Sequence, residues 1–262
     1  MTEVVIDQSR CVGCGLCASD CRAGAIRMEN GRARQDGDCM LCGHCVAICP
    51  HNAVSIPSYD MAGVEPVGER LPPEAFVRAV KSRRSVRRFT AEEIGRDDLL
   101  RLMEAGRYSP TAVNLQDCVF HIYQRALPAF KERFWQELPG ILESVRGQSE
   151  SCADTFARAL AARGRGDTQD MFFYNAPCLL VVSAHQPIDA ALAAAHIDIM
   201  AAAMGLGALY EGYLLTALQN CPALLPQFSP GGRRPACCML LGYPAVRYPR
   251  TAPRRPAAID FH

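Results

Sequence analysis

Eight cysteines in the first 50 residues follow one spacing used twice. The first run is Cys11, Cys14, Cys17 and Cys21, and the second is Cys39, Cys42, Cys45 and Cys49. Each reads C-x2-C-x2-C-x3-C, and the second begins 28 residues after the first and is followed by Pro50. The same offset relates Ala25-Ile26 to Ala53-Val54. We infer an internal duplication of a loop, a turn and a short strand.

This spacing favours iron–sulfur clusters over other uses of cysteine. Two-residue gaps let three thiolates of a tight loop bind one inorganic cluster, and the fourth cysteine of each run binds the other cluster. One [4Fe-4S] cluster would take Cys11, Cys14, Cys17 and Cys49, and the second would take Cys39, Cys42, Cys45 and Cys21. Zinc also accepts four thiolates, but structural zinc usually pairs two separated C-x2-C knuckles rather than triplets. His44, between two ligands, is surplus and is expected to be solvated.

Composition narrows the class of protein. Only six of the 14 cysteines follow residue 50, which is unlike a secreted disulfide scaffold and indicates a reducing compartment. A net charge of +1 gives no electrostatic case for nucleic acid or an acidic membrane. The longest apolar stretch, 190–209, is interrupted by His196 and Asp198, and the first residues include acids. We expect a soluble, unexported, cytoplasmic protein.

The rest of the chain predicts an α+β domain after a linker. Residues 58–73 are rich in proline and lack apolar periodicity, which is typical of a linker between domains 1–57 and 74–262. The segment PPEAFVRAVKSRRS predicts a helix with prolines at its start. Further helices are expected at 96–107, 127–145, 150–163 and 186–204, and strands at 118–124, 178–184 and 236–242.

A basic segment ends the first of these helices. It consists of Arg83, Arg84, Ser85, Arg87 and Arg88. A solvated helix end would explain it, whereas guanidinium and hydroxyl groups also match phosphate oxygens. A turn at 109–116, SPTAVNLQ, presents Thr111 and the amides of Asn114 and Gln116, which suit ribityl hydroxyls or a flavin's pyrimidine edge. Glycines of MGLGALYEGY at 204–213 allow backbone N–H groups to approach a ring.

Two family resemblances emerge from these motifs. Residues 1 to about 57 resemble the bacterial two-cluster ferredoxins. Residues 74–262 resemble the FMN-dependent nitroreductase family, whose domain has a central mixed sheet surrounded by helices. The matching positions are Arg83, Ser85 and Arg87; Ser109, Pro110, Thr111, Asn114 and Gln116; Ala176-Pro177; Gly205 to Gly212; Leu241 to Pro244; and Arg254, Arg255 and Pro256.

The second resemblance implies roles for individual residues. The phosphate of FMN, or groups near it, would contact Arg83, Arg84, Ser85 and Arg87, with Arg254 or Arg255 of the tail helping. Pro110, Thr111 and Asn114 of the turn would reach the flavin across a homodimer interface, because the family's sites are shared between two subunits, and Gln116 would also bind the cofactor. The backbone of Glu211 and Gly212 would face flavin N5.

The two halves together indicate an oxidoreductase. A cluster transfers one electron at a time, whereas flavin holds one or two. We expect electrons from an external donor, a ferredoxin or NAD(P)H, to pass through the clusters and FMN to a small acceptor such as a nitroaromatic, a quinone or an activated alkene. Two alternatives stay open: a non-catalytic carrier or redox sensor relaying electrons between protein partners, and an enzyme that oxidises NAD(P)H directly at the flavin.

Other residues are assigned structural roles. His196 and Asp198, on an alanine-rich helix, are expected to be satisfied core or interface groups. The six later cysteines are expected to be buried hydrophobic side chains. Phe134, Trp135 and Phe156 are assigned to core packing rather than to an element that covers substrate. No residue pattern points to a dedicated acid, base or nucleophile.

Overall fold

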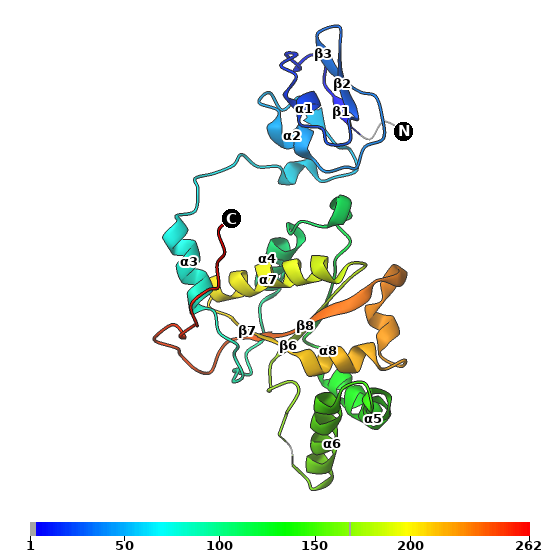
Figure 1. The fold of residues 1–262 in the computed structure, drawn as a ribbon, viewed down its shortest axis with the longest axis vertical. Helices are drawn as coiled ribbons and strands as arrows, with labels where there is room; N and C mark the ends of the chain where they lie inside the picture. The colour runs from blue at the N-terminus through cyan, green and yellow to red at the C-terminus, as the bar shows by residue number, and fades with distance from the viewer. Residues whose placement is uncertain (1–3, 168) are drawn as a thin grey trace. The chain divides into compact units, whose positions relative to one another are not determined.

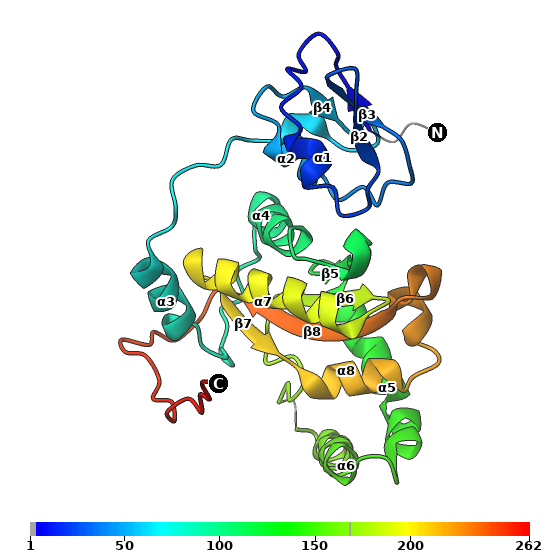
Figure 2. The ribbon, with the colours of Figure 1, turned by 45° about the horizontal axis from the view of Figure 1, so that its top comes forward.

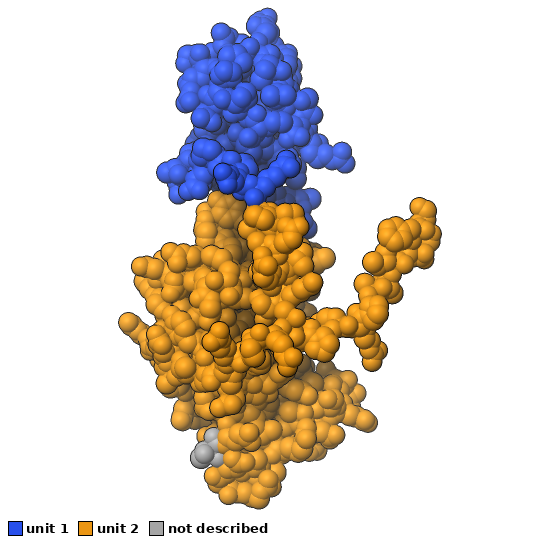
Figure 3. Space-filling model, turned by 90° about the vertical axis from the view of Figure 1, so that its left-hand side faces the viewer, with its two compact units in different colours: residues 1–70, 112–115 blue, residues 71–111, 116–262 orange. Residues whose placement is uncertain are grey.

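The computed structural model describes residues 4–167 and 169–262, and the chain divides into two compact units. Figure 3 colours unit 1, residues 1–70 and 112–115, in blue, and unit 2, residues 71–111 and 116–262, in orange. The division between residues 70 and 71 falls inside the expected linker. Within the described residues, none of the helices combines the length and apolarity needed to cross a bilayer.

Unit 1 consists of short elements in two similar halves (Figure 1). In chain order they are β1 (Val5–Ile6), α1 (Leu16–Ser19), β2 (Ile26–Glu29), β3 (Arg32–Gln35), α2 (His44–Ile48), β4 (Val54–Ser55) and the 3-10 turn η1 (Met61–Gly63). Strand β1 pairs antiparallel with β4, and β2 with β3. Each short helix follows a glycine in the left-handed region, Gly15 at φ 73° and Gly43 at φ 77°. The glycines are 28 residues apart, so the backbone repeats the duplication seen in the sequence.

Unit 2 is an α+β domain. Its helices are α3 (Pro73–Ser82), α4 (Arg96–Arg107), α5 (Leu127–Val145), α6 (Glu150–Gly164), α7 (Pro187–Ala203) and α8 (Gly212–Gln219). Its strands are β5 (Val119–Tyr123), β6 (Cys178–Ala184), β7 (Gly207–Tyr210) and β8 (Arg234–Gly242). Short 3-10 turns lie at η2 (Ala112–Asn114), grouped with unit 1, and at η3 (Leu225–Phe228) and η4 (Pro230–Gly232). The expected helices and strands are confirmed to within about three residues at each end, whereas β7 and α8 were not predicted.

One four-stranded sheet, in the order β5-β6-β8-β7, forms the middle layer of unit 2 (Figure 2). All three strand pairs are antiparallel, and a single parallel bridge between Ser85 and Ala208 adds the segment after α3 to the β7 edge. The mixed character expected of the sheet therefore comes, in the described residues, from this bridge. All seven residues of β6 are buried, because helices cover both faces of the sheet.

The two faces of the sheet carry separate apolar cores. Alternate β6 residues, such as Leu180 and Val182, pack with α4 and α7, whereas Leu179 and Val181 pack with α5, α6 and α8. The three aromatic side chains at 134, 135 and 156 belong to the second core or pack against it, as expected. Helices α4 and α7 approach closely at Gly106, where an added Cβ would lie 2.8 Å from Ile197 Cδ1. This packing fixes α7 over the sheet, and it thereby fixes the position of the side chains that the C-terminal half of α7 carries.

Candidate functional site

The eight N-terminal cysteines line two separate cavities, four to each. The first cavity is lined by Cys11, Cys14, Cys17 and Cys49, and the second by Cys21, Cys39, Cys42 and Cys45. Each cavity takes three thiols from one run and the last thiol of the other run, the crossed arrangement that the spacing predicts. His44 also lines the second cavity, and its Nδ1 lies 3.4 Å from Asp20 Oδ2. Its side chain is 61% exposed, which agrees with a solvated group outside the four thiols.

Backbone amides point at the sulfur atoms of both cavities. Ala25 N donates to Cys21 Sγ at 3.2 Å, and Ala53 N donates to Cys49 Sγ at 3.3 Å, again 28 residues apart. Hydrogen bonds to coordinating sulfurs help to set the reduction potential of a bound cluster. The loop around Cys11 is tight: an added Cβ on Gly13 would lie 2.0 Å from Gly31 O. Each of the two cavities therefore has four thiols, the donor set that a cluster of this type requires.

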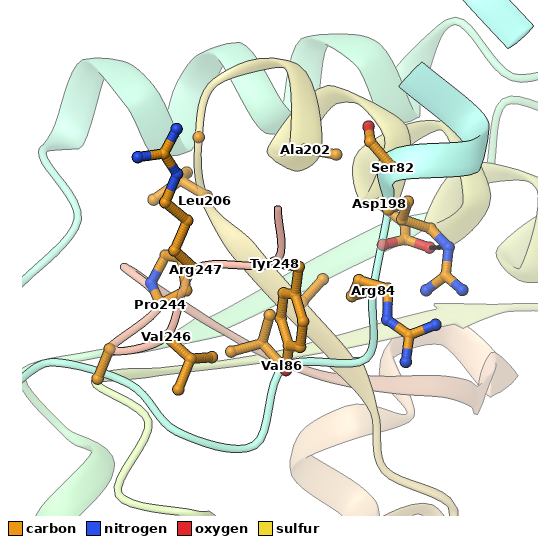
Figure 4. Close-up of a pocket in the computed structure, with 14 residues that line it drawn as sticks. Ser82, Arg84, Val86, Asp198, Ala202, Leu206, Pro244, Val246, Arg247 and Tyr248 are labelled. Carbon is orange, nitrogen blue, oxygen red and sulfur yellow. Dashed lines mark ion pairs between the residues drawn. The ribbon is translucent and has the colours of Figure 1, made fainter. Parts of the chain in front are cut away.

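Unit 2 contains a larger cavity of about 570 Å³ where the end of α3, the second half of α7 and the segment after β8 come together (Figure 4). Its 14 lining residues are Ser82, Arg83, Arg84, Val86, Asp198, Ala202, Gly205, Leu206, Ala208, Pro244, Ala245, Val246, Arg247 and Tyr248. Three guanidinium groups and one carboxylate face it, so its lining carries a net positive charge. The volume lies within the roughly 300–1,000 Å³ typical of cofactor sites.

The charged side chains of this cavity are held by specific contacts. Arg83 Nε lies 3.4 Å from Asp198 Oδ2, and the Arg84 guanidinium lies 5.5 Å from the ring centroid of Tyr248. Two backbone hydrogen bonds fix the segment after α3 against the chain beyond β8: Thr90 N donates to Tyr243 O, and Ala245 N donates to Arg88 O, each at 2.8 Å. The cavity is therefore built by segments far apart in sequence.

Three residues of the basic motif, Ser85, Arg87 and Arg88, lie outside the cavity lining. Ser85 forms the parallel bridge with Ala208, and Val86 N donates to Ala208 O at 3.0 Å. Val86 is buried and the next residue, Arg87, is exposed. The charge of Arg87 lowers the pKa of Glu211, which lies at the junction of β7 and α8. The motif thus divides between two sides of the β7 edge: Arg83 and Arg84 toward the cavity, Arg87 toward the junction.

Glu211 is a buried carboxyl at the start of α8. Its Oε1 accepts a hydrogen bond from Tyr213 N at 3.2 Å, which caps the helix, and Glu211 N donates to Cys238 O at 2.9 Å. Burial raises the pKa of Glu211 to about 7, while the N–H groups of Tyr213 and Leu214 and the charge of Arg87 act in the opposite direction. Gly212 follows as the first residue of α8 and is exposed. The Glu211-Gly212 backbone is therefore held rigidly between a strand and a helix.

The turn at 109–116 has a strained backbone and one buried anchor. Ser109 is buried, and its Oγ lies 2.8 Å from His196 Nδ1 on α7, which gives His196 the structural partner expected of it. Thr111 Oγ1 accepts from Gln116 N at 2.9 Å. Asn114 and Gln116 have φ values of 56° and 49°, in the left-handed region that side chains rarely adopt. Pro110 is exposed, and none of these turn residues is among the 14 that line the cavity.

The tail arginines lie apart from the cavity. Arg254 and Arg255 are exposed, and Arg254 Nη1 donates to the neighbouring Pro253 O at 3.1 Å. Instead, Arg247 and Tyr248, which sequence reasoning missed, line the cavity. The segment VRYPR contains basic and aromatic residues that could indicate a binding site. It has no helix or strand periodicity, so its position in the fold could not be predicted. Asp198 was noted only as a satisfied group, and its position in the cavity was also missed.

The six later cysteines behave as apolar side chains. Cys178, Cys221 and Cys238 belong to the two cores of unit 2. The other three, Cys118, Cys152 and Cys237, are partly buried and pack against these cores. Burial raises the pKa of Cys178 to about 12, so this thiol stays protonated near neutral pH. The expected structural role agrees with these positions.

Comparison with protein families gives two matches in chain order. The model of the 4Fe-4S dicluster domain matches residues 10–53, and the model of the nitroreductase family matches residues 80–243. Two nitroreductases crystallised with bound FMN share the fold of the second part. The structure from Bacteroides fragilis is 24% identical with a TM-score of 0.55, and that from Desulfitobacterium hafniense is 22% identical with a TM-score of 0.52. Each comparison covers 71% of this chain and 98% of the other.

Curated relatives match the cysteine-rich part. A component of an ion-translocating oxidoreductase complex from Methanosarcina acetivorans is 47% identical over 47 residues, 18% of this chain and 18% of the relative. A ferredoxin from Pyrobaculum islandicum is 43% identical over 55 residues, 20% of this chain and 51% of the relative. This chain thus spans about a fifth of the first relative and about half of the second.

Proposed function

Because the chain belongs to the nitroreductase family, we propose that it is an iron–sulfur flavoprotein oxidoreductase that uses two [4Fe-4S] clusters and FMN to reduce a small acceptor. Nitroaromatics, quinones and activated alkenes are the proposed acceptors, in that order. A reduced ferredoxin or NAD(P)H is the proposed donor, and the working form is a homodimer with FMN at the interface. When bound, the clusters transfer single electrons and FMN accepts or releases one or two.

The single observation that carries this proposal is the grouping of eight cysteines around two cavities in a chain that also has the nitroreductase fold. Cys11, Cys14, Cys17 and Cys49 would hold one cluster, and Cys21, Cys39, Cys42 and Cys45 the other. Amides such as Ala25 N and Ala53 N would donate to the coordinating sulfurs. A chain that only bound small molecules would have no use for two such centres.

The residues of unit 2 fit a flavin phosphate. Arg83, Arg84 and Arg247 bring positive charge to one cavity, and guanidinium groups bind phosphate oxygens through paired N–H donors. Ser85 and Arg87 would contact other groups of the cofactor from the β7 edge. The backbone of Glu211 and Gly212 would face the ring. Because the N–H of Glu211 donates to Cys238 O, the N–H of Gly212 would be the donor toward the flavin. Arg254, or else Arg255, of the tail would help at the phosphate. Pro110, Thr111 and Asn114 of the turn would complete the site of a partner subunit, and Gln116 would also bind the cofactor.

Turnover measurements test the proposal against a pure carrier. The protein is purified and reconstituted without oxygen, reduced by a ferredoxin or by NADH, and offered nitro, quinone and enone acceptors in turn. We expect saturable reduction of at least one acceptor class, and the more effective reductant identifies the donor. Electron transfer to proteins with no saturable small-molecule acceptor would instead identify a carrier or sensor.

A pair of arginine variants tests the phosphate site. Arg83→Ala removes a charged donor, so we expect FMN to bind about 10 to 100 times more weakly, as is typical for a lost hydrogen bond between charged groups. Arg146→Ala, at an exposed arginine ion-paired with Glu143, is the matched control and should bind FMN normally. Cluster absorbance should be the same in both variants. Equal FMN affinity in the two variants would show that Arg83 does not contribute to FMN binding.

A further inference from the structure

Asp198 introduces a negative charge into a cavity whose other charged groups are positive. It lies on α7, its side chain is only 8% exposed, and it lines the cavity (Figure 4). Arg83 and Arg84 line the same cavity. Burial raises the pKa of its carboxyl, and the charge of Arg83 opposes that shift. A buried carboxylate is costly unless it is paired, so its contact with Arg83 must offset that cost. Since the Asp198 carboxylate would repel a phosphate, its presence in this cavity calls for a function other than direct contact with the phosphate.

The contact geometry indicates that role. Asp198 Oδ2 approaches Arg83 at Nε, 3.4 Å away. A guanidinium has five N–H donors in a planar fork, and a partner at Nε leaves the edge formed by the two terminal nitrogens free. Arg83 directly follows α3, at its C-cap, and its side chain is 25% exposed, so without a partner it would have other rotamers available.

We propose that Asp198 is a positioning residue, which holds the Arg83 guanidinium by its Nε so that the terminal edge is presented to the phosphate of the bound flavin. This inference rests on the proposed FMN site and adds to it a residue that does not itself touch the cofactor. Because α7 is fixed over the sheet by its packing on α4 and β6, the carboxylate is a rigid support for a flexible side chain. Holding the arginine in advance reduces the entropy lost when phosphate binds.

Removing the Asp198 carboxylate should weaken FMN binding if it positions Arg83, and strengthen FMN binding if it mainly repels the phosphate. Asp198→Ala removes the support, so FMN should bind at least about tenfold more weakly. Asp198→Asn keeps an oxygen beside Nε and the size of the side chain, so its FMN affinity should stay within about threefold of the wild type. If the carboxylate mainly repelled phosphate, both variants would bind FMN more tightly, and the proposal would be wrong.

Riboflavin, which lacks the phosphate, separates positioning from general packing. Affinities of FMN and riboflavin for the flavin-free, cluster-loaded protein are measured by quenching of flavin fluorescence. The Asp198→Ala loss should appear with FMN and be absent with riboflavin, and Arg83→Ala with Asp198→Ala should bind no more weakly than Arg83→Ala alone. Equal losses for both flavins would overturn the proposal. If the alanine variant does not fold, Asp198→Ser, too short to reach Nε, takes its place under the same criteria.

The same experiment distinguishes failure of this inference from failure of the proposed function. A wild-type protein that binds neither flavin contradicts the proposed FMN site itself. A wild-type protein that binds FMN with an affinity unchanged in Asp198→Ala contradicts only the role of Asp198. Cluster absorbance reports that unit 1 is intact in each variant, and riboflavin binding reports the same for unit 2.

Discussion

Gly207→Ala is expected to damage the edge of unit 2 where we propose that flavin binds. Gly207 begins β7, next to the segment that carries the basic motif, and an added Cβ would lie 2.7 Å from Val86 Cγ2, 2.8 Å from Val86 Cβ and 3.0 Å from Val86 Cγ1. Val86 is buried, and its backbone is tied to Ala208, so neither partner can move freely. The substitution must push the motif away from β7.

The magnitude follows from overpacking. Inserting a methyl group into a well-packed site costs about 1–3 kcal/mol. For a unit of this size, that corresponds to a fall in Tm of about 2–12 °C. Since the displaced segment contains Arg83 and Arg87, FMN affinity should fall as well, whereas cluster absorbance should not change.

Thermal unfolding followed by circular dichroism, together with FMN titration, checks this expectation. Gly140→Ala is the matched control, because Gly140 lies inside α5 and an added Cβ would meet nothing within 4 Å. That substitution should stabilise the protein by about 0.5–1 kcal/mol through helix propensity. Adding Val86→Ala to Gly207→Ala should recover part of the loss. A Gly207→Ala protein as stable as the wild type, with unchanged FMN affinity, would refute the close packing at β7.

Two further predictions concern a buried acid and the crossed cysteines. Burial raises the pKa of Glu211 to about 7 from an ordinary value of 4.5, so the folded protein retains a proton that the unfolded chain releases. The flavin-free protein should therefore lose up to about 3 kcal/mol of stability as pH rises from about 4.5 to 7, and Glu211→Gln should abolish that loss in denaturation curves; an identical pH profile would contradict it. Cys21→Ala should perturb the cluster of the second run and reduce iron content, whereas Cys152→Ala should keep full iron; unchanged iron in both would contradict the crossed arrangement.

The sequence predicts the parts of this protein that local chemistry determines. The cysteine spacing predicts the two four-thiol sets that line the two cavities of unit 1, because ligation to a compact cluster restricts which thiols can meet. Helix α5 was predicted at 127–145 because a long apolar periodicity leaves little ambiguity. By contrast, β7 escaped prediction because it is four residues long, begins with glycine and gains its stability from pairing with β8.

The cavity of unit 2 depends on contacts that no local pattern encodes. Arg247 and Tyr248 enter it because backbone hydrogen bonds hold the segment after β8 against the segment after α3. Asp198 enters it because α7 packs at a fixed position on the sheet. In the sequence it was one acid on an alanine-rich helix, and its partner lies 115 positions earlier. The order of the motifs in the sequence predicted Arg83 and Arg84 as site residues. The other charged and aromatic residues of the cavity could be identified only from the three-dimensional structure.

Elemental and flavin analysis of protein purified and reconstituted without oxygen tests the central claim most directly. Two four-iron clusters and one flavin site predict about eight irons and one FMN per chain, with negligible zinc. Zinc bound by the eight cysteines, or full iron in a protein that takes up no FMN, would contradict the account.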